Sequence, residues 1–319
     1  MNSSAKYDRE KYMTTPEDFT FVGPDKNKRE EIYKPSLTYW QDAWRRFKKN
    51  RLAMTFLIFL GLVLFIAIFG QKISHFTYFE QNTKARFLTP TQGFKLGHFL
   101  GTDTLGRDIF ARISQGARVS MELAIIVATV CVVVGTIYGS IAAYFGGIVD
   151  MLMVRFIEIV IAVPSMIYII LLMVVMGNSV KTIIIALSLT RWLGYALLVR
   201  GEVLKLKENE YVMASQALGA SFFRIIIKHL IPNTLSVIIV KLTMDIPSII
   251  FSEAFLSFIG LGVPIPQASL GNLAADGFKE INSHVYLFLI PAIAISLITL
   301  SFNIIGDALS DALNPKLRD

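Results

Sequence analysis

Charged residues are scarce in this sequence. Asp, Glu, Lys and Arg make up 17% of the 319 residues, whereas hydrophobic residues make up 54%. An ordinary soluble domain contains about a quarter charged residues. The deficit argues against a single-core soluble enzyme and against a disordered chain. The composition instead fits a helical protein that crosses a membrane several times.

Cysteine and the common catalytic motifs are also nearly or wholly missing. The single cysteine, Cys131, lies in an apolar run, so it offers no intrachain disulfide and is interpreted as a small buried residue. The sequence contains no G-x-x-x-x-G-K-[ST], H-E-x-x-H or G-x-S-x-G motif, and its four histidines are scattered. We therefore predict no catalytic, cofactor-binding or metal-binding residues. Any energised transport must draw on an ion gradient or on another subunit.

Basic residues lie beside the apolar runs. The net charge is +7, from 31 Lys and Arg against 24 Asp and Glu. Positive charge beside apolar runs sets the orientation of a membrane protein, so we expect membrane lipid as a partner and no nucleic acid. Basic clusters precede the first run and follow the last one. Both termini are therefore predicted to be cytoplasmic.

Six apolar runs are long enough to cross a bilayer, and backbone groups in lipid must be paired within helices. The predicted fold class is an all-α, polytopic membrane bundle of about six transmembrane helices. The predicted spans are 52–70, 119–144, 150–176, 180–199, 233–252 and 285–307. The predicted domains are an N-terminal tail with an amphipathic interfacial helix (1–50), a first span with an extracytoplasmic loop (51–117), a core (118–311) and a cytoplasmic tail (312–319).

Several charged residues fall inside the predicted spans, where charge is costly and often functional. Lys241 and Asp245 are four residues apart on one helical face, and they are our candidates for lining a water-filled path; mutual neutralisation or snorkelling is the alternative. Arg155 and Glu158 are expected to pair in the same manner. Glu122 is expected in the first turn of the second span.

The inner segment between the fourth and fifth spans has an unusual pattern. Residues 211–218 are predicted to form a short helix rich in small side chains, and Gly219 suits the left-handed residue that ends a helix. Ser221 is a usual helix cap, and Pro232 marks the start of the next span. Such a helix could dock in a groove of a partner. An ordinary interhelical connection is the alternative.

This segment resembles the E-A-A-x-x-x-G loop of permease subunits of binding-protein-dependent ATP-binding-cassette (ABC) importers. Met213, Ala214 and Ser215 occupy the E-A-A positions, and Gly219 occupies the glycine. Two positions depart from the pattern, because Met213 replaces the acid and Ser215 replaces the second alanine. If that acid normally contacts the ATPase, Glu210 must substitute for it or the contact is absent.

A second motif is more specific. Residues 101–108 are similar to the G-T-D-x-L-G-R-D stretch of the dipeptide, oligopeptide and nickel group of these permeases, and of the C-type subunit in particular. Residues 253–262 and 302–315 match further stretches of that group, so the resemblance covers about residues 36–318. Within the motif, Gly101 and Gly106 permit tight turns. Its charged residues are expected to form a local ion-pair cluster: Asp103, Arg107 and Asp108.

The resemblance implies a type I ABC importer permease in a bacterial inner membrane, which is not itself an enzyme. Its implied partners are a second homologous permease, two cytoplasmic ABC ATPases and an extracytoplasmic solute-binding protein facing residues 71–117 and 253–284. The implied ATPase-coupling residues are Glu210, Tyr211, Met213, Ala214, Ser215, Ala217, Gly219 and Arg224.

The cargo implied by the resemblance is an oligopeptide or dipeptide, with nickel, glutathione or another small solute as the alternative. A self-contained secondary transporter is the alternative from a different class. It would be expected to show an internal repeat or an acidic proton relay, and we find neither in the sequence. A membrane scaffold or enzyme is disfavoured by the missing catalytic motifs.

Overall fold

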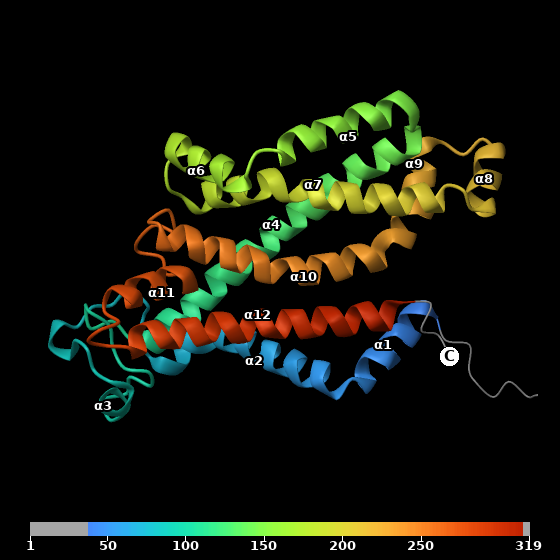
Figure 1. Ribbon diagram of the computed structural model, residues 1–319. Coiled ribbons are helices and arrows are strands. Elements are labelled where there is room, and N and C mark those ends of the chain that lie inside the picture. Colours follow the sequence, from blue (N-terminus) through green and yellow to red (C-terminus); the bar gives the residue numbers. More distant parts are fainter. Residues whose placement is uncertain (1–37, 315–319) are drawn as a thin grey trace, which may run out of the picture. The chain divides into compact units, whose positions relative to one another are not determined.

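The computed structural model describes residues 38–314, and this part of the chain is helical with no β-strand (Figure 1). The chain divides into two compact units, residues 1–41 and 42–319. Most of the predicted N-terminal tail and the last five residues of the predicted C-terminal tail lie outside the described residues. The helices are α1 (Tyr39–Lys49), α2 (Arg51–Ser74), α3 (Pro90–Phe94), α4 (Ile109–Phe145), α5 (Gly147–Ile161), α6 (Ser165–Met176), α7 (Val180–Leu206), α8 (Glu210–Ala217), α9 (Phe222–Ile225), α10 (Ile231–Phe258), α11 (Leu270–Lys279) and α12 (Tyr286–Leu313).

The first unit contributes only its last residues to the described chain. Thr38 lies before α1, and Thr38 and Gln41 exchange hydrogen bonds of 3.1 and 3.4 Å at the start of that helix. The helix predicted within residues 36–50 is therefore confirmed as α1. In the second unit, Phe47 on α1 is buried and stacks against the exposed ring of Trp44.

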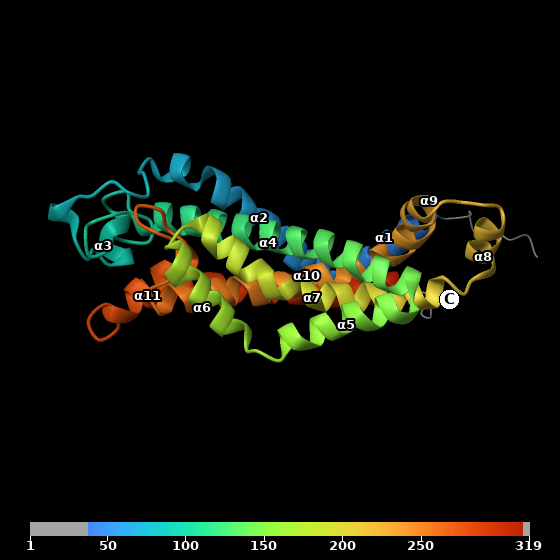
Figure 2. The same cartoon turned by 90° about the horizontal axis from the view of Figure 1, so that it is seen from above.

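Five helical segments of the described chain are long and apolar enough to cross a membrane. They are α2, α4, α7, the segment Phe222–Phe258 that contains α9 and α10, and α12. The predicted span over residues 150–176 passes the same test only as a pair of helices joined by a bend, which would make it the sixth span. This stretch divides into α5 and α6, which are bent by 75° (Figure 2). Pro164 lies at the break. Proline interrupts a helix because it has no N–H to donate and its ring clashes with the preceding turn.

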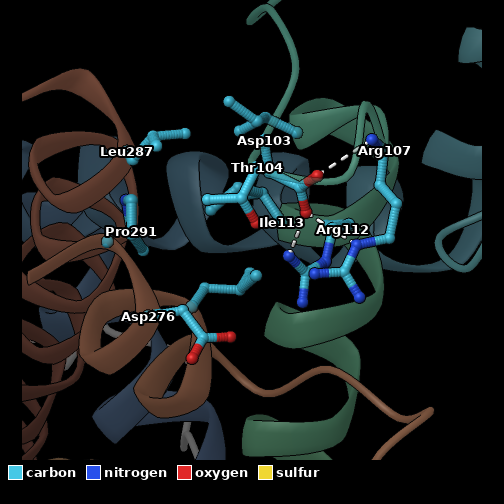
Figure 3. A pocket seen from close by; sticks show the side chains of 11 residues that line it. Asp103, Thr104, Arg107, Arg112, Ile113, Asp276, Leu287 and Pro291 are labelled. Atoms are coloured by element: carbon cyan, nitrogen blue, oxygen red, sulfur yellow. Dashed lines mark hydrogen bonds and ion pairs between the residues drawn. The ribbon is translucent and has the colours of Figure 1, made fainter. Parts of the chain in front are cut away.

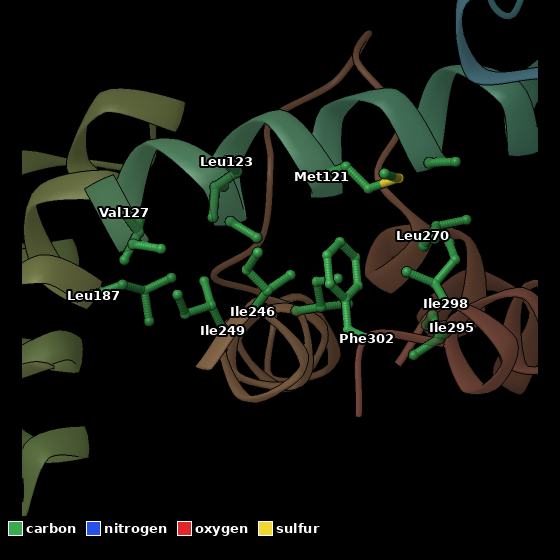
Figure 4. Close-up of a cluster of buried hydrophobic side chains, with 14 of the residues drawn as sticks. Met121, Leu123, Val127, Leu187, Ile246, Ile249, Leu270, Ile295, Ile298 and Phe302 are labelled. Atoms are coloured by element: carbon green, nitrogen blue, oxygen red, sulfur yellow. The ribbon is translucent and has the colours of Figure 1, made fainter. Parts of the chain in front are cut away.

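The core of the second unit is built around α4, which packs against α2, α7, α10 and α11, while α10 and α11 pack against α12. Apolar side chains from α4, α7, α10, α11 and α12 meet there, and residues of α1, α2 and α6 join the same cluster (Figure 4). The labelled members are Met121, Leu123, Val127, Leu187, Ile246, Ile249, Leu270, Ile295, Ile298 and Phe302. Cys131 is buried in the same cluster, as predicted.

The helices α4 and α7 approach most closely at two glycines of α4. A Cβ atom at Gly135 would lie 2.5 Å from the Tyr195 Cβ and 2.7 Å from the Trp192 carbonyl oxygen. A Cβ atom at Gly139 would collide with the Ala196 carbonyl oxygen. Small residues four apart let two membrane helices pack backbone to backbone. The pair α4–α7 is therefore held at a separation that only glycine permits.

Several helices extend beyond the predicted spans, and two of these extensions change the position of a carboxylate. The second span starts at Ile109, so Glu122 lies well inside α4 rather than in its first turn, and there it pairs with Arg118 (2.8 Å). The fifth span continues to Phe258, which places Glu253 inside α10 rather than in an outer loop. Both differences arise because polar residues that face protein neighbours extend helices beyond their apolar segments.

Candidate functional site

The helix α8 lies at one end of the second unit, and α3 and α11 lie at the opposite end (Figures 1 and 2). The predicted short helix is confirmed, since α8 spans Glu210–Ala217 between two bends. At its end, the Leu218 N–H donates to the Ala214 carbonyl (3.0 Å) and the Gly219 N–H donates to the Gln216 carbonyl (2.9 Å). Gly219 has φ +78°, so the predicted left-handed conformation is also confirmed.

One side chain anchors α8 to the rest of the protein. Val212 is the buried residue of α8, and it belongs to an apolar cluster with Val199 and Val203 of α7 and with Ile225. The remaining side chains of α8 are exposed or half-buried. Leu218, directly after the helix, is 89% exposed. Val212 is therefore the buried apolar anchor of α8, and the exposed side of the helix combines the small Ala214 and Ala217 with the larger Tyr211 and Met213.

Hydrogen bonds and ring contacts connect the segment around α8 to the end of α4. The Lys207 ammonium at the end of α7 donates to the Ala143 carbonyl of α4 (2.9 Å). The Phe222 ring at the start of α9 lies 4.7 Å from the Tyr144 ring and 5.0 Å from the Phe145 ring, centroid to centroid. A displacement of α8 would therefore be transmitted to both α4 and α7.

Two of the predicted coupling residues, Tyr211 and Ser215, form hydrogen bonds with other residues of this chain. The Ser215 hydroxyl donates to the Tyr211 carbonyl (2.8 Å), and the Tyr211 hydroxyl accepts from the Asn233 amide (3.3 Å). Glu210 and Arg224 are both exposed. Neither of these two charges has an ion-pair partner among residues 38–314. The outward side chains at the predicted coupling positions are Glu210, Met213, Ala214, Ala217 and Arg224.

At the opposite end, Asp103 organises the outer motif (Figure 3). Its carboxylate accepts from the Arg107 guanidinium (2.7 Å) and from the Arg112 guanidinium (2.5 Å). It also accepts from the backbone N–H groups of Leu105 (2.8 Å) and Arg107 (2.9 Å). Asp103, Arg107 and Arg112 line a small cavity of about 40 Å³ that is also lined by Asp276 of α11. The predicted ion pair between Asp103 and Arg107 is confirmed.

Asp108 does not belong to that ion-pair cluster, so this part of the prediction is wrong. Its carboxylate instead contacts the His98 ring (3.0 Å) and accepts from the Ala111 N–H (2.7 Å) as the N-cap of α4. Burial raises the pKa of Asp108, and the contacts with Ala111 and His98 oppose that shift. Asp108 therefore fixes the start of α4.

The two glycines of the motif have positive φ, +82° at Gly101 and +73° at Gly106. A Cβ atom at Gly101 would collide with the Leu88 carbonyl oxygen, and one at Gly106 would collide with the Asn82 carbonyl oxygen. Both features exclude other residues at these positions. The predicted tight turns are confirmed. Together, the two turns and the Asp108 N-cap fix the chain at the start of α4.

A polar seam runs along the contact between α7 and α10. We use this name for Arg191 and Tyr195 of α7 together with Lys241, Asp245, Ser248 and Ser252 of α10. The predicted pairing of Lys241 with Asp245 is confirmed at 3.0 Å, and the Lys241 ammonium also lies over the Tyr195 ring (5.6 Å). The four residues of α10 follow a helical repeat, so they share one face.

Sequence reasoning missed Glu253, which is fully buried in α10. Its carboxylate accepts from the hydroxyls of Ser120 in α4 (3.0 Å), Ser257 in α10 (2.9 Å) and Ser269 at the start of α11 (2.7 Å). One carboxylate therefore joins three helices. The signal in the sequence is the four-residue spacing of Glu253 and Ser257, which continues the helix into the expected outer loop.

Comparison with known proteins shows similarity over almost the whole chain. Residues 135–319 match the family described as binding-protein-dependent transport system inner membrane component, and residues 38–90 match the N-terminal transmembrane domain of oligopeptide transport permease C. The dipeptide transport system permease protein DppC of Bacillus subtilis (strain 168) is 44% identical over 311 residues, which are 97% of this chain and 96% of that protein. The oligopeptide transport system permease protein OppC of the same strain is 44% identical over 289 residues, covering 91% and 93% of the two chains. The OppC protein of Haemophilus influenzae is 39% identical over 311 residues, covering 96% and 99%.

Proposed function

The chain belongs to the family of binding-protein-dependent transport system inner membrane components, and from this premise we propose that it forms half of a peptide translocation path. It is a multi-pass membrane permease subunit of an ABC importer. The other half of the path is a second, homologous permease. The cargo is a dipeptide or oligopeptide, which is supported by the names of the relatives. Nickel, glutathione or another small solute is the alternative cargo.

The energy comes from two cytoplasmic ABC ATPases that bind at α8. The observation that carries this proposal is the construction of α8, which Val212 anchors while its small side chains face outward. The contacts of Lys207 with Ala143 and of Phe222 with Tyr144 connect this end to α4 and α7. Closure of the ATPase pair on ATP would draw the coupling helices together, and hydrolysis would reset them.

The orientation follows from this assignment. The end of the protein that carries α8 faces the cytoplasm, together with the N- and C-termini, in a bacterial inner membrane. The opposite end, with α3 and α11, faces the extracytoplasmic solute-binding protein. The positive charges before α2 and within residues 200–231 support this direction.

The polar seam between α7 and α10 is the proposed translocation surface. Lys241 and Asp245 place a paired charge within a spanning helix, where solvated groups mark solute pathways. The break between α5 and α6 at Pro164 lies beside it, since a cavity next to Arg191 is also lined by Pro164 and Ser165. A broken helix is a suitable hinge for alternating access.

Two substitutions in and after α8 test the coupling proposal. Ala214→Arg places a long charged side chain on the exposed face of α8, and Gly219→Pro is incompatible with φ +78° and removes the N–H that bonds to Gln216. Both variants should insert into the membrane at normal levels and should lose peptide uptake. Gln41→Arg, at an exposed position of α1 outside both proposed docking surfaces, is the control for the added charge and should leave insertion and uptake intact.

The measurements are immunoblots of membranes, uptake of a labelled peptide, and co-purification of the two ATPases in mild detergent. Ala214→Arg should also reduce that co-purification. Normal uptake by either variant would contradict the coupling assignment. Uphill accumulation by vesicles that contain this chain alone would instead support a secondary transporter.

A further inference from the structure

Arg191 is a charged residue near the middle of the spanning helix α7 that has no carboxylate partner. Its guanidinium donates to the Ser248 hydroxyl (3.1 Å), the Ser248 carbonyl (3.1 Å) and the Ser252 hydroxyl (2.6 Å). All three acceptors are neutral. No ion pair to Arg191 occurs among residues 38–314. Charges at membrane depth usually pair with an opposite charge or serve a solute pathway.

The charges nearest to Arg191 do not neutralise it. Asp245 is the acidic residue of the polar seam, and it is already paired with Lys241 at 3.0 Å. The seam therefore contains two cations, Arg191 and Lys241, and one anion. Its remaining titratable groups, Tyr195 and the neighbouring Cys131, carry no positive or negative charge at neutral pH. The surplus positive charge lies at Arg191.

Arg191 also lines a cavity of about 340 Å³. One wall is the break between α5 and α6, and the opposite wall consists of α7 and α10. Three hydroxyl-bearing residues, Ser165, Thr190 and Ser252, line it together with apolar side chains such as Ile169 and Leu193. A site with one charged group, a few hydroxyls and apolar walls has the composition of a small-molecule pocket, and its volume is within the usual range of such pockets.

We propose that Arg191 binds a carboxylate of the solute during translocation, and that for a peptide this group is the C-terminal α-carboxylate. The inference rests on the proposed function, because it assumes that the seam lines the path. A guanidinium binds a carboxylate through two parallel hydrogen bonds, and these charge-assisted bonds are about twice as strong as bonds to neutral acceptors. The solute can therefore displace Ser248 and Ser252, which hold the side chain in the empty pocket.

The apolar part of the cavity completes the proposed site. Ile161 and Val163, the exposed apolar residues of its lining, would accept the side chain of the terminal residue without a fixed hydrogen-bonding pattern, so peptides of different sequence would fit. The α-carboxylate is the one anionic group that all peptides share. Arg191 therefore recognises the class of solute rather than its sequence.

The test is uptake by the complete importer in proteoliposomes with an unaltered solute-binding protein. A protease-resistant tripeptide is supplied either with a free C-terminal carboxylate or with a C-terminal amide, and the ratio of the two initial rates is measured. Because the binding protein is unchanged, its own preference contributes equally to every ratio. A change in the ratio therefore reports on this chain.

Arg191→Gln should slow uptake of the free acid and leave the amide nearly unchanged, so the ratio should fall about tenfold, as the loss of a charged hydrogen bond predicts. Arg191→Lys keeps the charge but loses the bidentate geometry, so its ratio should fall by about threefold. Arg155→Gln is the control, since Arg155 is an exposed arginine paired with Glu158 (2.7 Å), and its ratio should match the wild type.

An unchanged ratio in Arg191→Gln would overturn the inference. Equal loss of both peptides at normal assembly would also overturn it, because Arg191 would then hold the structure or bind a carboxylate of the partner permease. If Arg191→Gln fails to assemble, Arg191→Lys decides, and an unchanged ratio there overturns the inference. Failure of the wild-type importer to transport either peptide would refute the proposed function itself.

Discussion

The contact between α4 and α7 leads to a quantitative prediction for Gly139→Ala. The new Cβ atom would collide with the Ala196 carbonyl oxygen and would lie 2.9 Å from the Arg200 nitrogen. Both are backbone atoms within a helix, so no side-chain rotation can relieve the contact and the two helices must separate. Overpacking of this kind costs about 1–3 kcal/mol. Alanine recovers up to about 1 kcal/mol through its higher helix propensity. With the full gain, the net loss should be about 0–2 kcal/mol relative to the wild type.

The assay is thermal unfolding of the purified protein in mild detergent. A loss of this size should lower the Tm by up to about 3 °C for a chain of 319 residues. Gly194→Ala and Gly201→Ala in α7 are matched controls, because a Cβ atom at either position meets nothing within 4 Å. These controls should be neutral or stabilised by up to about 1 kcal/mol. A Tm of Gly139→Ala equal to or above that of Gly194→Ala would refute the packing argument.

Two further predictions concern buried carboxylates. Glu253→Ala removes the acceptor of three serine hydroxyls and should destabilise the protein by about 3 kcal/mol. The control Glu122→Ala, at an exposed ion pair, should cost less than about 1 kcal/mol. Equal melting temperatures of the two variants would contradict this prediction. Asp103→Asn removes the carboxylate that pairs with both Arg107 and the buried Arg112, so the turn that contains Arg107 should loosen. Trypsin should then cleave at Arg107 faster than in the wild type or in the control Asp276→Asn. Unchanged cleavage rates would contradict the role of Asp103.

Much of the fold follows from patterns within single segments. Apolar runs of membrane length identified the spans, because a backbone segment in lipid can pair its N–H and C=O groups within a helix. Gly219 marked the end of α8 because a left-handed φ favours glycine. Pairs such as Lys241 with Asp245 could be predicted because residues four apart share a helical face. Each of these inferences needs only the local chain.

Contacts between segments that are far apart in the chain could not be predicted from the sequence. Asp108 pairs with His98 rather than joining the neighbouring Asp103, because the turn before α4 directs the two carboxylates to different partners. The sequence shows a proline at position 164, but only the structure shows a 75° break there and a cavity between this break and Arg191. A proline permits a bend, and the neighbouring helices determine how large it is.

The sequence by itself determined the class of protein, the helical character of its spans, the short helix at α8 and the family resemblance. These depend on hydropathy, helical periodicity and backbone conformation, which are properties of neighbouring residues. Only the tertiary structure decided that Glu253 is fully buried among three serines and that Arg191 lines a cavity to which residues 38–314 contribute no carboxylate. The environment of a charged side chain depends on segments far away in the chain, so it emerges only when the helices pack.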